Sequence, residues 1–100
     1  MPKNGFVYIL TNLTNSILCT GVAVDLAGRI RELRRGTGAD IMSQHKATKL
    51  VYFETARSIR SANERERQIR KDSRRKKLDL IDAMNPEWRD LADDITRQRR

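Results

Sequence analysis

The stretch that decides the fold is Phe6–Val22, FVYILTNLTNSILCTGV. Two short apolar runs flank a polar loop at Thr11–Asn15, and the first run carries Tyr8 at its centre. Short runs rich in β-branched and aromatic residues favour strands, and so short a connection predicts an antiparallel hairpin. The second run ends in Cys19-Thr20-Gly21. A helix with Arg29 on its inner flank is predicted to follow, so the arrangement brings a phenol, a guanidinium and a backbone opened by glycine together on one sheet.

The rest of the chain continues the sheet and covers it with helices. Asp25 is a predicted helix cap, and that helix reaches about Arg35. LVYFET at Leu50–Thr55 predicts a third strand, followed by helices over about 58–71 and 73–84. Ser58 caps the first of these two helices, with Ser61 as an alternative start one turn later. The order ββαβαα predicts an α+β (α/β) fold, a three-stranded antiparallel or mixed sheet flanked by helices.

Length and composition indicate one small domain. The 100 residues include 38% hydrophobic residues, which favours a single domain over 1–92 with a thin core. Trp88 and Leu91 are expected to fold back onto that domain, and 93–100 reads as a polar, flexible tail. No run approaches the roughly 20 apolar residues of a membrane span, and no secretory signal is visible, so we expect a cytoplasmic protein. One Cys and one His exclude an internal disulfide and a Cys/His zinc site within one chain.

The positive charge is concentrated in one segment. Residues 55–77 hold ten Lys/Arg and three Asp/Glu, whereas the whole chain has a net charge of +8. Such a block attracts polyanions by neutralising phosphates, although a solvated helix face has the same composition. An anionic membrane fits less well, because the segment offers few large apolar residues to insert. The predicted nucleic-acid-binding residues are Arg57, Arg65, Arg70, Lys71, Arg74, Arg75 and Lys76.

One carboxylate in the basic segment is predicted to point inward. Glu66 lies on the same helix face as Ile59, Ala62 and Ile69, which are spaced to cover the sheet. A buried carboxylate is costly unless it is paired or binds a cation. Two interpretations remain open: a salt bridge to an inner arginine such as Arg29, or a ligand for a hard cation such as Mg²⁺.

Arg29 falls at the edge of the apolar stripe formed by Leu26, Ile30 and Leu33 on the first helix. A guanidinium at that place can bind a phosphate through its planar fork, or it can pair with an acidic residue. Tyr8, taken alone, reads as a core aromatic with its hydroxyl at the rim.

Several motifs, in order and spacing, resemble the GIY-YIG nuclease domain, and in particular its small single-domain bacterial branch. The resemblance covers about residues 5–92 and implies a mixed three-stranded sheet among helices. It also implies metal-dependent hydrolysis of DNA phosphodiesters. The motifs are VYIL at Val7–Leu10, TGV at Thr20–Val22, DLAGRI at Asp25–Ile30, KLVYFE at Lys49–Glu54, RERQIR at Arg65–Arg70, SRRKK at Ser73–Lys77 and MNPEWRDL at Met84–Leu91.

The resemblance implies a role for four positions. Tyr8 matches the tyrosine that helps to activate the attacking water, and Arg29 matches the arginine that steadies the scissile phosphate. Glu66 matches the glutamate that holds a single Mg²⁺ or Mn²⁺ ion, and Gly21 matches the glycine of the second motif. Cys19 stands at the catalytic position of the second motif's tyrosine.

Other positions depart from the family pattern. Leu33 replaces a histidine, Met42 and His45 stand where a threonine and a tyrosine are expected, and Lys71-Asp72 replaces a glycine–tryptophan pair. Leucine can neither carry a proton nor bond a phosphate, and a thiol is a weaker donor on a shorter side chain than a phenol. These changes predict reduced activity.

Three functions therefore remain open. The leading hypothesis is a metal-dependent DNA endonuclease of reduced activity. The alternative is a catalytically inactive module on the same scaffold that binds DNA (branched, nicked or single-stranded) or RNA. A small basic protein that docks on the ribosome or another assembly is the third. None of the three involves a membrane or a small-molecule cofactor.

Overall fold

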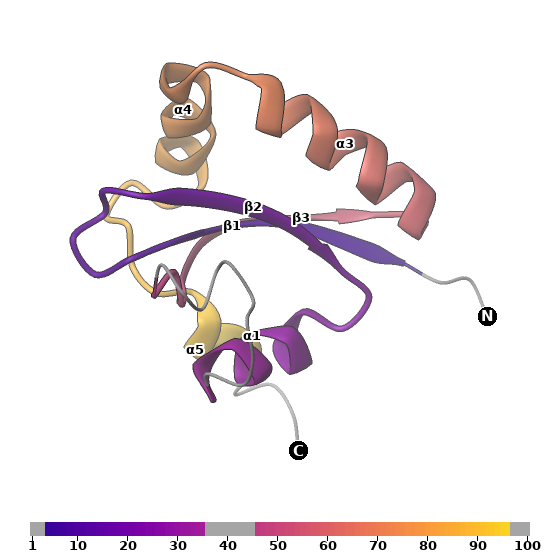
Figure 1. The fold of residues 1–100 in the computed structure, drawn as a ribbon, viewed down its shortest axis with the longest axis horizontal. Helices are drawn as coiled ribbons and strands as arrows, with labels where there is room; N and C mark the ends of the chain where they lie inside the picture. The colour runs from indigo at the N-terminus through magenta and orange to yellow at the C-terminus, as the bar shows by residue number, and fades with distance from the viewer. Residues whose placement is uncertain (1–3, 36–45, 97–100) are drawn as a thin grey trace.

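A computed structural model describes residues 4–35 and 46–96 of the chain. A three-stranded sheet of order β2-β1-β3 lies between two helical layers, α3 and α4 on one face and α1 and α5 on the other (Figure 1). Both strand pairs are antiparallel, so the predicted α+β fold is confirmed and the sheet is not mixed. The elements are β1 Gly5–Thr11, β2 Leu18–Ala23, α1 Leu26–Arg34, β3 Lys49–Ala56, α3 Ile59–Lys71, α4 Arg74–Met84 and α5 Ala92–Thr96.

The central strand β1 contributes to the core on both faces. Val7 and Ile9 belong to the apolar cluster under α3 and α4, while Tyr8 and Leu10 belong to the cluster with α1 and α5. Successive side chains of a strand point to opposite faces, so a strand covered on both sides needs an unbroken apolar run. This is why VYIL shows no polar alternation.

Local capping fixes where the helices begin. The Asp25 carboxylate accepts from the Gly28 amide at 3.1 Å and caps α1 as predicted. The Ser58 hydroxyl accepts from the Ser61 amide at 3.0 Å, which decides in favour of Ser58 as the start of α3. Each cap supplies an acceptor for an amide that has no partner within its own helix.

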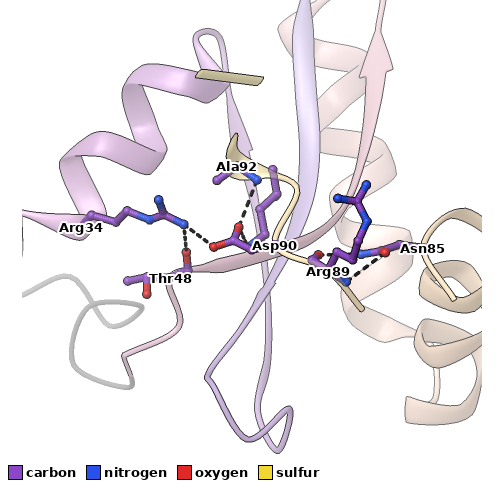
Figure 2. Close-up of polar contacts among 7 residues, drawn as sticks. Arg34, Thr48, Asn85, Arg89, Asp90 and Ala92 are labelled. Atoms are coloured by element: carbon purple, nitrogen blue, oxygen red, sulfur yellow. Dashed lines mark hydrogen bonds and ion pairs between the residues drawn. The ribbon is translucent and has the colours of Figure 1, made fainter. Parts of the chain in front are cut away.

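The segment after α4 is fastened to β3 by the buried side-chain amide of Asn85. Figure 2 shows its bonds to Arg89 in the same segment. Nδ2 of Asn85 donates to the Val51 carbonyl at 3.2 Å and to the Arg89 carbonyl at 2.8 Å. Its Oδ1 accepts from the Arg89 amide at 3.0 Å. The register of β3 on β1 shifts beside Val51, so Asn85 binds the strand at its irregular point.

Asp90 fastens the same segment a few residues further on. Its Oδ1 accepts from the amides of Leu50 and Ala92, at 3.2 and 3.0 Å, and its Oδ2 accepts from Arg34 of α1 (Figure 2). The Leu91 amide donates to the Leu50 carbonyl at 2.7 Å. Both backbone groups of Leu50 that face away from β1 are thus satisfied, which closes this part of the outer edge of β3.

The segment after α4 packs on both faces of the sheet. Leu91 is buried against the α1 cluster and Trp88 packs on the opposite cluster, as predicted. Residues 93–96, expected to begin a flexible tail, instead belong to α5, and Ile95 packs against the α1 cluster. Along 4–35 and 46–96, no helix has both the length and the apolar character required to cross a membrane.

Candidate active site

Tyr8 and Arg29 are brought together as the sequence suggested. Tyr8 is 1% exposed, and Nε of Arg29 donates to its hydroxyl at 3.3 Å. Nη1 of Arg29 binds Oε1 of Glu32 at 3.0 Å, one turn further along α1. Among the residues that the structure describes, Arg29 pairs with Glu32 and not with Glu66 or Glu54. The contacts to Tyr8 and Glu32 hold the guanidinium at the rim of the α1 face.

Gly21 is required by the Tyr8 ring. The two residues are direct partners across β1 and β2, and an ideal Cβ on Gly21 would lie 2.5 Å from both Cζ and Oη of Tyr8. No real Cβ approaches an aromatic ring so closely, so any side chain here would displace the phenol. The glycine of the second motif thus makes room for the tyrosine of the first.

Glu66 points inward and is held by two neighbours. The Thr20 hydroxyl donates to its Oε2 at 2.7 Å, and Nε of Arg70 lies 3.5 Å from the same oxygen. The Glu66 side chain is only 14% exposed. The predicted inward orientation is confirmed, and its salt bridge is to Arg70, four residues along α3, instead of Arg29.

The contact of Glu66 with Thr20 and the contact of Arg29 with Tyr8, beside Gly21, lie on opposite faces of the sheet at β2. Direct partners in an antiparallel pair project to the same face. Thr20 is paired with Ile9, under α3, whereas Gly21 is paired with Tyr8, over α1. Figure 1 shows these helices on either side of the sheet. The contacts of Glu66 and of Arg29 thus converge on two successive residues of the edge strand.

Two positions that depart from the family pattern, Cys19 and Leu33, serve the core. Cys19 is paired with Leu10 and packs, partly buried, against the α1 cluster, and Leu33 is buried in that cluster. Met42 and His45 lie outside the described residues. At positions 19 and 33 the chain therefore supplies apolar contacts where a hydroxyl and an imidazole are expected.

Glu66 fits a metal as a single ligand. Within 4–35 and 46–96, no three His, Cys, Asp or Glu residues are grouped to hold an ion. Both contacts of Glu66 with described residues are made by Oε2. Among those residues every buried side-chain oxygen has a hydrogen-bond partner, so Oε1, which has none, reaches solvent. One carboxylate oxygen suits Mg²⁺, which often completes its shell with water and substrate phosphate.

Three of the seven predicted nucleic-acid-binding residues are already ion-paired. Arg65 binds Glu54, Arg70 binds Glu66, and Arg75 binds Asp79. The first two lie on different flanks of α3, because Glu54 belongs to β3 while Glu66 meets β2. The other four are exposed on or beside α3 and α4: Arg57, Lys71, Arg74 and Lys76.

The β3 flank of α3 carries a second polar cluster and a cleft. Nε and Nη2 of Arg65 both donate to the Glu54 carboxylate, at 2.9–3.1 Å, and the Tyr52 hydroxyl donates to the same group. Next to Arg65, a cleft of about 360 Å³ opens between α3 and α4. Its lining is Arg65, Asp72, Lys76, Asp79, Leu80 and Ala83.

Thr20 is the site residue that sequence reasoning missed. It is the middle residue of the second motif, where hydrophobic pattern alone assigns no role. Its function depends on the register of β2, since only the pairing with Ile9 turns it towards α3. The available signal was the inward carboxylate of Glu66, which needs a hydrogen-bond donor on the sheet.

Comparison with known proteins agrees with the geometry. The family described as the GIY-YIG catalytic domain matches residues 4–79. A UPF0213 protein of Syntrophus aciditrophicus is 40% identical over 88 residues, covering 87% of this chain and 98% of the relative. One from Clostridium perfringens is 40% identical over 78 residues, covering 78% of this chain and 83% of the relative.

A solved structure supports the same assignment. The solution NMR structure of a UPF0213 protein from Bacillus halodurans matches with a TM-score of 0.55 and 28% identity. The match covers 90% of this chain and 95% of that one. Because the family match spans most of the sequence, the chain belongs to the GIY-YIG domain family, among the UPF0213 proteins.

Proposed function

We propose that this chain is a metal-dependent nuclease that hydrolyses phosphodiester bonds of DNA. GIY-YIG domains are in general endonuclease domains that act on nucleic acid and depend on a divalent ion. The observation that carries the proposal is the convergence of two contacts on the edge strand. Arg29 and Tyr8 meet Gly21 on one face, and Glu66 meets Thr20 on the other.

A phosphodiester that touches both groups has to lie along the edge of β2. Arg29 would bind the phosphate oxygens there and stabilise the charge that builds up on them. The Tyr8 hydroxyl accepts from Nε of Arg29 and so orients the guanidinium. Its role in activating the attacking water, implied by the resemblance, requires substrate binding to uncover the buried hydroxyl.

Glu66 would hold the Mg²⁺ or Mn²⁺ ion through Oε1. When bound, the ion supplies positive charge at the phosphate and the leaving oxygen. Exposed basic residues of α3 and α4, such as Lys71 and Arg74, would hold the flanking strand through its phosphates. The apolar residues at positions 19 and 33 remove two polar groups, which predicts slow turnover.

Nicking of supercoiled plasmid in Mn²⁺ tests the proposal. We expect Glu66→Ala to lower the nicking rate by about 100-fold or more, because the ion loses its protein ligand. Glu64→Ala is the matched control: it removes the same charge from the same helix at a side chain that is 58% exposed, and it should nick like wild type. Equal rates in wild type and Glu66→Ala would overturn the proposal.

A catalytically inactive nucleic-acid-binding module is the second candidate. The packing of Cys19 and Leu33 on the α1 cluster favours it, since both side chains make apolar contacts there. It predicts salt-sensitive binding of DNA or RNA that needs no metal and survives Glu66→Ala. Retained binding without cleavage of nicked, branched and single-stranded substrates would select this function, whereas cleavage of any of them would exclude it.

A further inference from the structure

We propose that Thr20 and Arg70 set the divalent-ion affinity of Glu66 with opposite sign. The inference rests on the proposed function, because it assumes that Glu66 binds the ion. Both residues contact Oε2 of Glu66, one from β2 and one from α3. One contact is a neutral hydrogen bond and the other is a positive charge, so they act on an approaching cation in different ways.

Thr20 orients the carboxylate. Its hydroxyl is carried on a β-branched side chain in a paired strand, so few rotamers are open to it. The hydrogen bond of 2.7 Å fixes Oε2 against the sheet and leaves Oε1 towards solvent. Groups that hold a metal ligand in place typically contribute 10–100-fold in affinity. Thr20 is therefore a positioning residue for the ion.

Arg70 opposes the ion. Its guanidinium lies 3.5 Å from Oε2 and neutralises the charge of Glu66. A divalent ion at the same carboxylate is repelled by that charge, so Arg70 has to move away. It can do so at small cost, because its side chain is 60% exposed and such ion pairs contribute little stability.

A phosphate gives the displaced guanidinium a new partner. Arg70 is on the β2 flank of α3, where the proposed substrate lies, and arginine binds phosphate oxygens readily. The nucleic acid would then take Arg70 away from Glu66 as the ion arrives. Arg70 thereby acts as a counter-ion that keeps Glu66 occupied until a substrate is present.

Paramagnetic broadening by Mn²⁺ alone tests the inference without any turnover. Amide signals of ¹⁵N-labelled protein are followed during a Mn²⁺ titration, and broadening near Thr20, Gly21 and Glu66 gives a site-specific apparent Kd. We expect Thr20→Val to weaken binding by about tenfold or more, while Thr20→Ser restores it. Arg70→Gln should tighten binding several-fold, because the competing charge is gone.

Arg60→Gln is the matched control for Arg70→Gln. Arg60 pairs with Glu64 at the same i,i+4 spacing on the same helix, but its side chain is 91% exposed and its acidic partner is not Glu66. Its loss should therefore leave Kd unchanged. The amide spectra also show whether each variant is folded. If Thr20→Val does not fold, Thr20→Ser and Arg70→Gln still decide the inference.

The outcomes separate this inference from the proposed function. Broadening that disappears in Glu66→Ala but is equal in wild type, Thr20→Val and Arg70→Gln overturns the inference and leaves the nuclease proposal standing. Weaker binding in Arg70→Gln also overturns it. No broadening around Glu66 in wild type overturns both, because the carboxylate then binds no ion.

Discussion

At the scale of single residues, the cluster of Tyr52, Glu54 and Arg65 has shifted acid–base properties. Burial raises the pKa of Tyr52 to about 12, and the hydrogen bond to the charged Glu54 adds to the shift. Burial alone would raise the pKa of Glu54, but the hydrogen bonds from Arg65 and Tyr52 outweigh it and hold that pKa below its usual value. The neutral phenol and the ionised carboxylate therefore support each other.

This cluster predicts how stability changes with pH. Because the pKa of Glu54 is lowered on folding, its contribution is present above the ordinary value of 4.5 and is lost as pH falls through the folded-state pKa. Because the pKa of Tyr52 is raised, its contribution is present below 10.0 and is lost as pH rises towards 12. Urea unfolding midpoints, measured at intervals of about one pH unit from pH 3 to 12, show the loss of stability at both the acidic and the alkaline end.

Tyr52→Phe isolates the alkaline limit. The variant should be less stable than wild type at neutral pH, because Glu54 loses a donor, but its stability should fall less steeply between pH 10 and 12. The comparison uses the slope of stability against pH and not the stability itself, so a general destabilisation of the variant does not affect it. Identical alkaline slopes would show that the Tyr52 pKa is not raised on folding.

Arg65 also shows what a sequence conceals about single residues. Its position in a basic block predicts a nucleic-acid contact, yet in the folded chain the guanidinium is bound to Glu54 by Nε and Nη2. The two residues are eleven positions apart in different elements. A charge count along the chain cannot reveal this pairing, which depends on how α3 lies over β3.

At the scale of elements, the connection after α4 is held along the outer edge of β3 by hydrogen bonds. Asn85 is its central side chain, and Asn85→Ala would leave the Val51 carbonyl and both backbone groups of Arg89 without that partner. Buried groups that lose their hydrogen bonds typically cost about 1–3 kcal/mol each, so we expect the free energy of unfolding to fall by about 3 kcal/mol. Urea unfolding measures it.

Asn63→Ala provides the control for this substitution. Asn63 is exposed on α3, and surface changes of this kind usually stay within about 0.5 kcal/mol. If Asn85→Ala unfolds at the same urea concentration as Asn63→Ala, the segment 85–91 is not held by the amide in the way described.

Elements that depend on local chemistry were predictable, and those that depend on long-range pairing were not. The hairpin and the caps at Asp25 and Ser58 follow from neighbouring residues, and the structure has them. The contact of Thr20 with Glu66 spans 46 positions and requires the register of β2 on β1. The helical turn of α5 packs on the α1 cluster, and the polar sequence of this turn does not predict that contact.

At the scale of the whole molecule, the site is distributed between two layers that share one strand. Fold class and three of the site residues, Tyr8, Arg29 and Glu66, could be predicted because the family motifs carry them. Their division between the two faces of the sheet could not, since motif order says nothing about which helix lies on which face. A ligand that contacts both Arg29 and Glu66 would therefore have to follow the edge of β2.

The shared strand also has a consequence for hydrogen exchange. β1 is bonded to a strand on each side and buried on each face, so neither helical layer can expose its amides by opening alone. We expect the amides of Val7–Leu10 to exchange slowest, with protection equal to the free energy of global unfolding, and those of α1 or α4 to exchange through smaller openings. Faster exchange in β1 than in α3 would contradict this order. If the expected order holds, Tyr8 keeps its position in every partial opening of the molecule, while Arg29 and Glu66 are displaced when α1 or α3 opens.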